Sequence, residues 1–323
     1  MAIVFNLVLN LDHEVETTDS TDLTDLTLIF YHSIRSDSIH SDFFIILFIL
    51  ILFILILIMI IQFQNGENTY KANLSKPIDI SIPLIFNNLD NPNAWYCPSP
   101  EAEPQRFSDF NIAVENGAAV NSMGVRLFPH GNGTHTEGVG HLMNQSNWVT
   151  VNQALRTFHC LARLISVFPT RTSEGNSVIL KTQIEKALGH DEPFDALIVR
   201  TLPNHDLKPK MQWSGTNPAF FEDEALSFVA QMGIKHLLTD LPSVDKEDDG
   251  GKVAGHRAFW CYDGENLPAG RQGTEGMRFD ATITEMIYVP STVRDGLYLL
   301  NLQIPPFELD AAPSKPVLYA LMQ

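Results

Sequence analysis

The sequence has few cysteines and few basic residues. Its three cysteines, Cys97, Cys160 and Cys261, are far apart, and none stands in a CxxC pair that would indicate a zinc or redox site. We expect them to be buried free thiols, an arrangement typical of a reducing compartment. Lys and Arg number 21 against 38 Asp and Glu, so the formal net charge is -17. Such a charge repels a phosphate backbone, and with no basic patch in the sequence no nucleic-acid partner is expected.

A long apolar run, residues 43–61, contains no polar side chain. Since an α-helix rises about 1.5 Å per residue, the run is long enough for a transmembrane helix. Only Arg35 is cationic before the run, whereas Lys71 and Lys76 follow it, so the positive-inside tendency places the C-terminal part in the cytoplasm. The alternative is that residues 1–66, with their Thr/Asp and Phe/Ile/Leu repetition, are translated upstream sequence. We therefore expect a cytoplasmic domain that is anchored to a membrane only if the run is genuine.

From about Tyr70 the sequence changes to alternating apolar and polar runs that are broken by Pro and Gly. We therefore divide the chain into a low-complexity region, residues 1–67, and one domain, residues 68–323. The chain is 45% hydrophobic, which is enough for the core of such a domain. Strands are predicted at residues 124–128, 195–202, 234–238, 282–289 and 297–304, and a helix from Asn217-Pro218 to Gly233. The pattern indicates the α/β class, with a single sheet-rich domain and flanking helices.

The segment from His130 to His141 contains three imidazoles and one carboxylate in twelve positions. Zinc and similar transition metals bind imidazole nitrogen and carboxylate oxygen, so this set is typical of a metal site. His135 and Glu137 are two residues apart, which on a strand puts both side chains on one face. The alternative is an exposed polar turn, which explains any one of these histidines better than it explains all four groups together.

A second set of polar residues follows the strand predicted to end at residue 238. Thr239–Asp245 comes directly after that strand, and His256-Arg257 follows shortly afterwards. Farther along, Glu285 stands among large apolar residues, where a carboxylate costs free energy unless it is paired or bound to a metal ion. The alternatives are a solvated acidic loop and an edge strand with Glu285 facing water.

In this order, the motifs resemble the cyclase family of metal-dependent hydrolases. The family pattern is a His, then Gly-Thr-His, an acid and a final His, followed far downstream by Thr-Asp-x-x-Ser-x-Asp, Ala-His-Arg and an isolated Glu. The likeness runs from about Lys71 to near the C-terminus and covers Gly133–His135, Glu137, His141, Thr239–Asp245, His256-Arg257 and Glu285. The resemblance implies the cyclase fold, a swivelling β/β/α type. The best-known activity of the family is kynurenine formamidase, or arylformamidase, an enzyme of tryptophan catabolism.

The resemblance also implies roles for the site residues. His130, His135 and Glu137 would bind one ion, while Glu137 would bridge to a second ion held by His256 and Glu285. His141 would be the catalytic acid/base, giving a proton to the departing amine after a metal-activated water attacks the amide carbonyl. Residues near the site would be Thr239, Asp240, Ser243, Asp245 and Arg257. The implied cofactor is zinc, as one or two ions, with manganese as the alternative, and the implied partners are a small-molecule amide and further copies of the chain in a homo-oligomer.

The chain departs from the family pattern at several positions. His130 lies five residues before His135, one more than usual, so its binding to the ion requires a local bulge. Glu137 replaces Asp, Val139 stands where the family commonly has Pro, Gly255 replaces Ala, and residues 264–276 look like an inserted loop. The expected function is hydrolysis of an aryl formamide such as N-formylkynurenine. The alternatives are hydrolysis of a cyclic amide or lactam, and a non-catalytic, membrane-anchored metal-binding domain.

Overall fold

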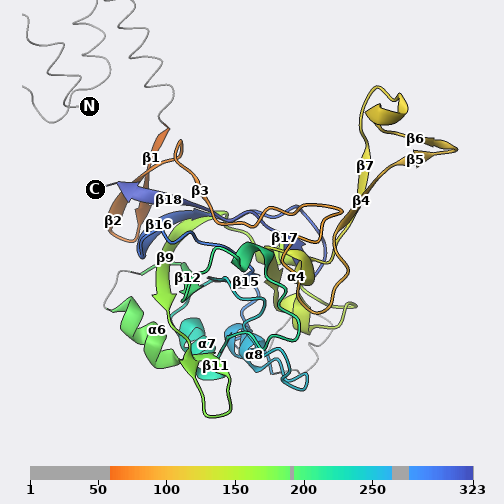
Figure 1. The fold of residues 1–323 in the computed structure, drawn as a ribbon. Helices are drawn as coiled ribbons and strands as arrows, with labels where there is room; N and C mark the ends of the chain where they lie inside the picture. Colours follow the sequence, from red (N-terminus) through yellow and green to blue (C-terminus); the bar gives the residue numbers. More distant parts are fainter. Residues whose placement is uncertain (1–58, 190–192, 264–275, 323) are drawn as a thin grey trace, which may run out of the picture. The chain divides into compact units, whose positions relative to one another are not determined.

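The computed structural model describes the chain from residue 59 to residue 322, with gaps at 190–192 and 264–275 (Figure 1). Residues Ile60–Gln323 form one compact unit. This unit begins earlier than residue 68, where the sequence pattern predicts the domain to start. The reason is that β1 (Ile60–Asn65) pairs along its whole length with β2 (Asn68–Asn73).

The apolar run predicted to cross a membrane falls almost entirely outside the described residues. Positions 43–58 are not described, and the last two residues of the run, Ile60 and Ile61, belong to strand β1. From residue 59 onward, in the part of the chain that the structure describes, no helix has the length and apolar character needed to span a bilayer.

The centre of the fold is a large mixed sheet, which comprises 11 strands among the described residues. In spatial order these are β1, β2, β18 (Val317–Met322), β16 (Gly296–Asn301), β9 (His159–Val167), β12 (Ala196–Thr201), β14 (His236–Thr239), β15 (Thr282–Glu285), β8 (His135–Gly138) and β17 (Ala311–Pro313), with β3 (Ile78–Asp79) paired to β18. Strands β9, β12, β14 and β15 are parallel, whereas β16 and β8 join the two sides of this block antiparallel. Parallel neighbours need crossover connections, which the helices supply.

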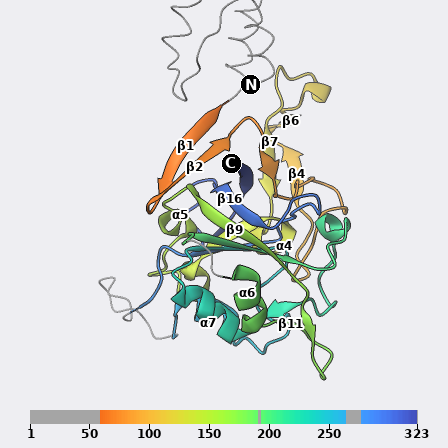
Figure 2. The same cartoon turned by 90° about the vertical axis from the view of Figure 1, so that its left-hand side faces the viewer.

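Three helices pack on one face of the sheet: α6 (Lys181–Leu188), α7 (Asp223–Gln231) and α8 (Ala254–Trp260), as Figures 1 and 2 show. Alternate strand residues face them, since Leu161 and Leu197 belong to the same core cluster as the buried side chains of these helices. The intervening residues Ala162 and Ile198 belong to a second core on the other face. Burial on both faces explains why the first four residues of β12, Ala196–Val199, are all apolar.

The helix predicted to start at Asn217-Pro218 begins later, at Asp223, whose carboxylate stands in the first turn. Residues Phe220–Phe221 form strand β13 instead, because Phe221 pairs with β11 (Ser177–Ile179) and donates its N–H to the carbonyl oxygen of Val244. The end of the helix is as predicted, with Gly233 in the left-handed region at a φ of 79°.

The other predicted strands are present, although their bounds differ. Residues 195–202 and 234–238 correspond to β12 and β14, and residues 297–304 to β16. The strand predicted at 282–289 ends at Glu285, because the next residue, Met286, has a φ of 51° and cannot continue the strand.

A narrow arm extends from the body of the unit, formed by residues that precede the segment His130–His141 (Figure 1). It consists of β4 (Glu101–Pro104) paired with β7 (Met123–Arg126), followed outward by β5 (Arg106–Phe107), β6 (Phe110–Asn111) and the 3₁₀ helix η1 (Val114–Asn116). Strand β7 matches the strand predicted at 124–128 and leads into the short helices α4 (Pro129–Asn132) and η2 (Val139–Leu142) that flank β8. The remaining short elements are α5 (Val151–Ala154), β10 (Thr170–Arg171) and η3 (Lys208–Lys210).

Candidate metal centre

Strand β8 carries two of the candidate ligands and is buried along its whole length. It lies between β15 and β17 and is antiparallel to both. In the register of β8 with β15, His135 is opposite Glu285, so residues from two distant motifs meet across one strand pair. The side chains of His135 and Glu137 lie together on one face of β8, as their two-residue spacing predicts, and both residues have 0% exposed surface.

His130 reaches the site through a single helical turn, α4, in place of the local bulge expected from the sequence. Pro129 occupies the first turn of α4, where its fixed φ suits the helical conformation. As a result, Nδ1 of His130 lies 3.1 Å from Oε2 of Glu137, despite the extra residue between His130 and His135.

Two further imidazoles approach the same glutamate from separate helices. Nε2 of His256, on α8, lies 2.9 Å from Oε1 of Glu137. Nδ1 of His141, on η2, lies 3.8 Å from Oε2 of Glu137. The ring centroid of His141 is 4.4 Å from that of His130 and 5.4 Å from that of His256, so the three rings form a continuous group around one carboxylate.

Nε2 of His135 is buried without a hydrogen-bond partner among the described residues, and the only close polar neighbour of Oε2 of Glu137 there is Nδ1 of His130, at 3.1 Å. Nδ1 of His135 lies 2.9 Å from the carbonyl oxygen of Gly133 and must donate to it, so Nε2 of the neutral ring carries a lone pair. That lone pair lies 3.4 Å from Oε2 of Glu285, which is also an acceptor. Converging acceptors without a donor are costly in a buried site, whereas a cation between them satisfies all of them. Imidazole nitrogen and carboxylate oxygen are a donor set that zinc favours.

The potential ligand atoms fall into two groups that share Glu137. In one group, atoms of His130, Glu137 and His141 lie within 4.8 Å of one another, and in the other those of His135, Glu137 and Glu285 do. His256 lies beside the second group, with Nε2 3.8 Å from Oε1 of Glu285. The structure therefore brings together all the residues that the sequence predicts as ligands, with Glu137 at the centre. The grouping differs from the expected one, because the group of His130 includes His141, and His135 lies in the group of Glu285.

The charges of the metal-free site depend strongly on one another. Burial alone would raise the pKa of Glu137, but the surrounding imidazoles of His141, His256 and His130 hold it well below its ordinary value. Burial alone would lower the pKa of His256. The charge of Glu137 and the hydrogen bond to Asp245 overcome this effect and raise that pKa well above its ordinary value. In the same way, hydrogen bonds to Asp310 and Glu137 overcome burial and raise the pKa of His130 to about 10.

Asp245, the last residue of the Thr239–Asp245 motif, holds His256 in place. Its Oδ2 accepts a hydrogen bond from Nδ1 of His256 at 2.5 Å, and its Oδ1 accepts the N–H of Gly255 at 2.6 Å. This hydrogen bond keeps a proton on Nδ1, so Nε2, which faces Glu137, is the nitrogen that can bind an ion once its own proton is displaced. A carboxylate behind a ligating histidine is a common second partner in metal sites.

Comparison with known proteins identifies the family of the chain. A family model described as "Putative cyclase" matches residues 72–246, a stretch that contains both the His130–His141 segment and the Thr239–Asp245 motif. The chain belongs to the cyclase family. No curated protein sequence matches it.

Several solved structures share the cyclase fold of the chain. A potential metal-dependent hydrolase with cyclase activity is 16% identical, with a TM-score of 0.51 over 76% of this chain and 98% of that chain. A predicted metal-dependent hydrolase from Bacillus stearothermophilus is 15% identical, with a TM-score of 0.51 over the same 76% and 98%. An isatin hydrolase bound to the product analogue thioisatinate is 12% identical, with a TM-score of 0.53 over 76% of this chain and 93% of that chain. At these identities the likeness shows the fold.

The other residues expected near the site of this cyclase occupy different positions. Oγ of Ser243 accepts the N–H of Asp245 at 3.1 Å and so shapes the loop. Thr239 ends β14, and its carbonyl oxygen accepts the N–H of Ile287 at 3.1 Å. Arg257 points away from the ligand group, since its guanidinium binds the carbonyl oxygen of Lys252 and lies over the ring of Tyr262.

Asp240 is also directed away from the ligand group, toward a buried lysine that the sequence does not reveal. Nζ of Lys208 lies 2.6 Å from Oδ2 of Asp240, and Thr201 donates both its N–H and its hydroxyl to the same carboxylate. The side chains of Lys208 and Asp240 are 9% and 0% exposed. This buried ion pair ties the motif loop to β12 and does not contact the candidate ligands.

The most important residue that the sequence does not reveal is Asp310. Its Oδ2 lies 2.8 Å from Nε2 of His130 and 3.2 Å from Nδ1 of His141. The only signal in the sequence is an isolated acidic pair, Glu308 and Asp310, after Pro305-Pro306. That signal is weak, because acidic residues between strands are commonly exposed loop residues.

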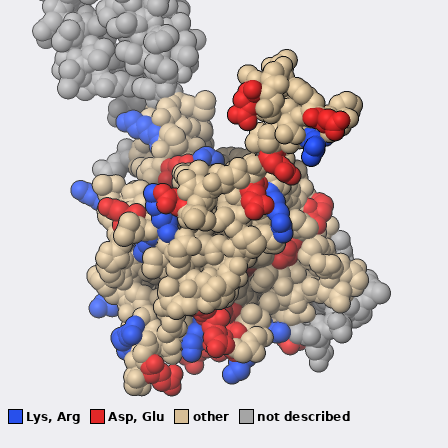
Figure 3. Space-filling model, turned by 45° about the vertical axis from the view of Figure 1, so that its right-hand side comes forward, with Lys and Arg blue, Asp and Glu red and all other residues tan. Residues whose placement is uncertain are grey.

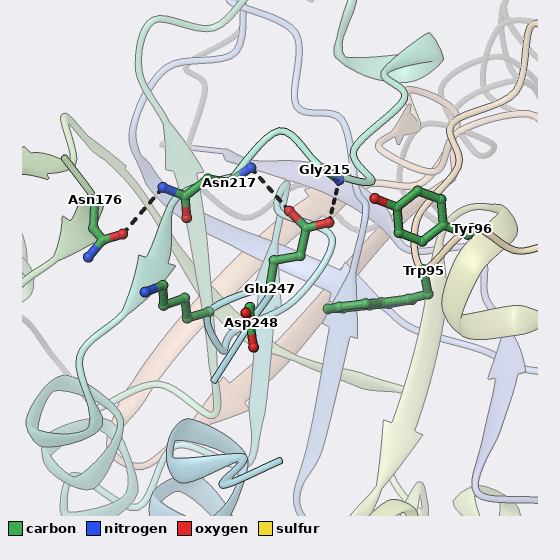
Figure 4. Close-up of a pocket in the computed structure, with 8 residues that line it drawn as sticks. Trp95, Tyr96, Asn176, Gly215, Asn217, Glu247 and Asp248 are labelled. Carbon is green, nitrogen blue, oxygen red and sulfur yellow. Dashed lines mark hydrogen bonds between the residues drawn. The ribbon is translucent and has the colours of Figure 1, made fainter. Parts of the chain in front are cut away.

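A cavity of about 520 Å³ lies beside the loop that continues from Asp245 (Figure 4). Its wall is formed by Trp95, Tyr96, Asn176, Gly215, Asn217, Lys246, Glu247 and Asp248. Glu247 accepts the N–H groups of Gly215 and Asn217, which fixes this side of the cavity. The aromatic side begins next to Ala94, whose N–H binds the carbonyl oxygen of Gly131 in α4. On the molecular face shown in Figure 3, acidic and basic side chains are interspersed.

Proposed function

We propose that this cyclase is a metal-dependent amide hydrolase, with an aryl formamide as its substrate. The observation that carries the proposal is the buried Nε2 of His135, an acceptor without a hydrogen-bond partner among the described residues, which lies with the carboxylates of Glu137 and Glu285. A cation between these acceptors satisfies all of them, whereas the metal-free site relies on protons on His130 and His256. Zinc is the proposed ion, with manganese as the alternative, and the two ligand groups that share Glu137 support two ions.

Some residues of the site are proposed to bind the ion, and one is proposed to transfer the proton. When bound, an ion of this kind lowers the pKa of a water molecule and polarises the amide carbonyl. His130, His135, Glu137, His256 and Glu285 are the proposed ligands. His141 is the proposed acid/base, because it lies at the rim of the group with its side chain 29% exposed, where a substrate can reach it. Its proton goes to the nitrogen of the departing amine.

An aromatic substrate is supported by two aromatic residues, Trp95 and Tyr96, in the wall of the cavity beside the loop that continues from Asp245. Hydrolysis of a cyclic amide is the second candidate. It is favoured by the shared fold with an isatin hydrolase, which acts on such a ring, although that protein is only 12% identical to this chain.

The proposal is tested by metal analysis together with an amidase assay of the purified chain. We expect bound divalent metal in stoichiometric amount and turnover of N-formylkynurenine or of a small lactam. His135→Ala should lose metal, whereas His205→Ala, which changes an exposed histidine outside the ligand group, should retain it. Equal metal content in these two variants contradicts the metal site.

The His141→Ala variant separates an enzyme from a non-catalytic metal-binding domain. If His141 is the acid/base, the variant keeps its metal and loses turnover by about 10²- to 10⁴-fold. If wild type binds metal but hydrolyses none of the formamides and lactams tested, the non-catalytic alternative is favoured. Loss of metal from His141→Ala would instead assign His141 to the ligands, as its place beside His130 and Glu137 permits.

A further inference from the structure

Asp310 is fixed beside the metal centre by its main chain rather than by its side chain. The carbonyl oxygen of Asp310 accepts the N–H of Gly138, at the end of β8, at 3.1 Å. The carbonyl oxygen of the preceding residue, Leu309, accepts the N–H of Val151 at 2.7 Å. These two bonds attach the start of β17 to β8 and α5, so the carboxylate of Asp310 is held next to the imidazoles regardless of its charge.

One oxygen of this carboxylate accepts hydrogen bonds from two histidines. Oδ2 of Asp310 lies 2.8 Å from Nε2 of His130 and 3.2 Å from Nδ1 of His141. An ionised carboxylate can only accept, so each of these ring nitrogens must carry a proton. In His130, the opposite nitrogen then faces Glu137, as a ligand atom should. In His141, the opposite nitrogen, Nε2, has no hydrogen bond to any described residue.

Asp310 is itself poorly placed as a ligand. Its side chain is 30% exposed, whereas those of Glu137 and Glu285 are 1% and 4% exposed. It also stands outside both groups of atoms that converge within 4.8 Å. Among the described residues its carboxylate forms hydrogen bonds with the imidazoles of His130 and His141, which is typical of a carboxylate that orients histidines.

We propose that Asp310 is a positioning residue that holds the proton of His141 on Nδ1 and so directs Nε2 of His141 to the substrate. This inference rests on the proposed hydrolysis. In the reaction, Nε2 of His141 takes a proton from the attacking water, whose oxygen forms the new bond to the carbonyl carbon. Nε2 then gives that proton to the amine nitrogen, which leaves with the electron pair of the broken C–N bond. Throughout the reaction the other proton of the ring stays on Nδ1, which donates it in the hydrogen bond to Asp310.

The tautomer of His141 tests the proposal without any turnover. Nitrogen NMR of ¹⁵N-histidine-labelled protein, metal-free and metal-loaded, at a pH where the ring is neutral, should show the proton of His141 on Nδ1. In Asp310→Ala the proton should move to Nε2, the nitrogen favoured by a free imidazole, and in the control Glu308→Gln it should stay on Nδ1. Glu308 is a suitable control because its carboxylate binds Thr150 and Asn152 instead of the histidines. A tautomer that is the same in wild type and Asp310→Ala overturns the proposal, even if the chain proves not to be a hydrolase.

The dependence on the leaving group tests the role in catalysis. N-formylkynurenine releases a basic amine that needs a proton, whereas 4-nitrophenyl formate releases a phenolate that does not. We expect Asp310→Ala to lower kcat per bound metal about 10- to 100-fold on the formamide and by a smaller factor on the ester, because the ester needs His141 for the proton of the attacking water but not for the leaving group. Asp310→Asn, which keeps the size of the side chain, carries the same expectation if the alanine variant does not fold. An equal loss on both substrates, or no loss on the formamide, overturns the proposal.

Discussion

Loading the metal centre should release protons, because two of its imidazoles are protonated in the metal-free chain. The pKa of His130 is raised to about 10, and that of His256 is also raised well above its ordinary value, so both rings carry an extra proton at pH 7. An ion that binds a ring nitrogen displaces the proton from it. We therefore expect two protons to be released when two ions bind, one from each ring.

The size of the effect follows from the number of protons. Each proton released raises the association constant for the metal tenfold per pH unit, as long as the pH is below the pKa of the ring. The proton of His130, whose pKa is about 10, accounts for roughly 10²-fold over the two units from pH 6 to pH 8, or about 2.7 kcal/mol, and the proton of His256 adds to this. The stability of the metal-free chain has the opposite pH dependence, since the contribution of the His130 proton falls as the pH rises. The proton on His130 stabilises the fold fully below the ordinary pKa of 6.5, and this contribution is lost as the pH rises toward about 10.

Calorimetric titration of the metal-free protein in buffers of different ionisation enthalpy measures the proton count directly. At pH 7 the slope of the binding enthalpy against the buffer enthalpy should be about two. His256→Gln should reduce the count to about one, and His205→Gln, which alters an exposed ring outside the site, should leave it at two. A count near zero, with an affinity that does not change between pH 6 and pH 8, would refute the assignment of charges in the site.

Two substitutions test the surroundings of the site. Lys208→Met leaves Asp240 buried without its partner and should lower the free energy of unfolding by about 3–5 kcal/mol in denaturant titrations, whereas Lys210→Met, which breaks an exposed pair, should change it by less than about 1 kcal/mol. Gly131→Ala places a Cβ 2.7 Å from Cβ of Cys97, so it should cost about 1–3 kcal/mol and weaken metal binding through the neighbouring His130. Unchanged stability and metal affinity in the alanine variant would mean that α4 is not tightly packed.

The sequence predicts the part of the site that lies on one strand. His135 and Glu137 need only the two-residue repeat of a strand to share a face, and that repeat is visible in the sequence. Asp245 and His256 also lie close together in the chain, so their contact depends on one loop and the start of one helix. Local spacing therefore identifies His135 and Glu137, whereas Asp245 and His256 stand out only through the resemblance to the cyclase family. The buried strand β12 is also visible locally, from its apolar residues Ala196–Val199.

The sequence predicts less where the order of strands decides the outcome. Asp310 lies 180 residues after His130, and the two meet only because β17 pairs with β8 at the edge of the sheet. The helical pattern around Phe221 misplaced the start of α7, since an apolar residue before a helix can equally pair with a strand and Phe221 does so with β11. Neither pairing leaves a local signal, because strand partners are chosen by the fold as a whole.

The number of carboxylates that the fold brings together around Glu137 bears on how many ions the site binds. Beside Glu137, strand β15 contributes Glu285, the segment before β17 contributes Asp310, and Asp245 binds the helix α8. These four carboxylates surround four imidazoles in a largely buried space, so the metal-free site needs protons on its rings to limit the repulsion. Two divalent cations neutralise four carboxylates with every ring neutral, whereas one cation leaves two negative charges for protonated rings to offset. The proton count measured on loading therefore also distinguishes one ion from two, since an ion held only by the His130 group leaves His256 protonated and releases one proton.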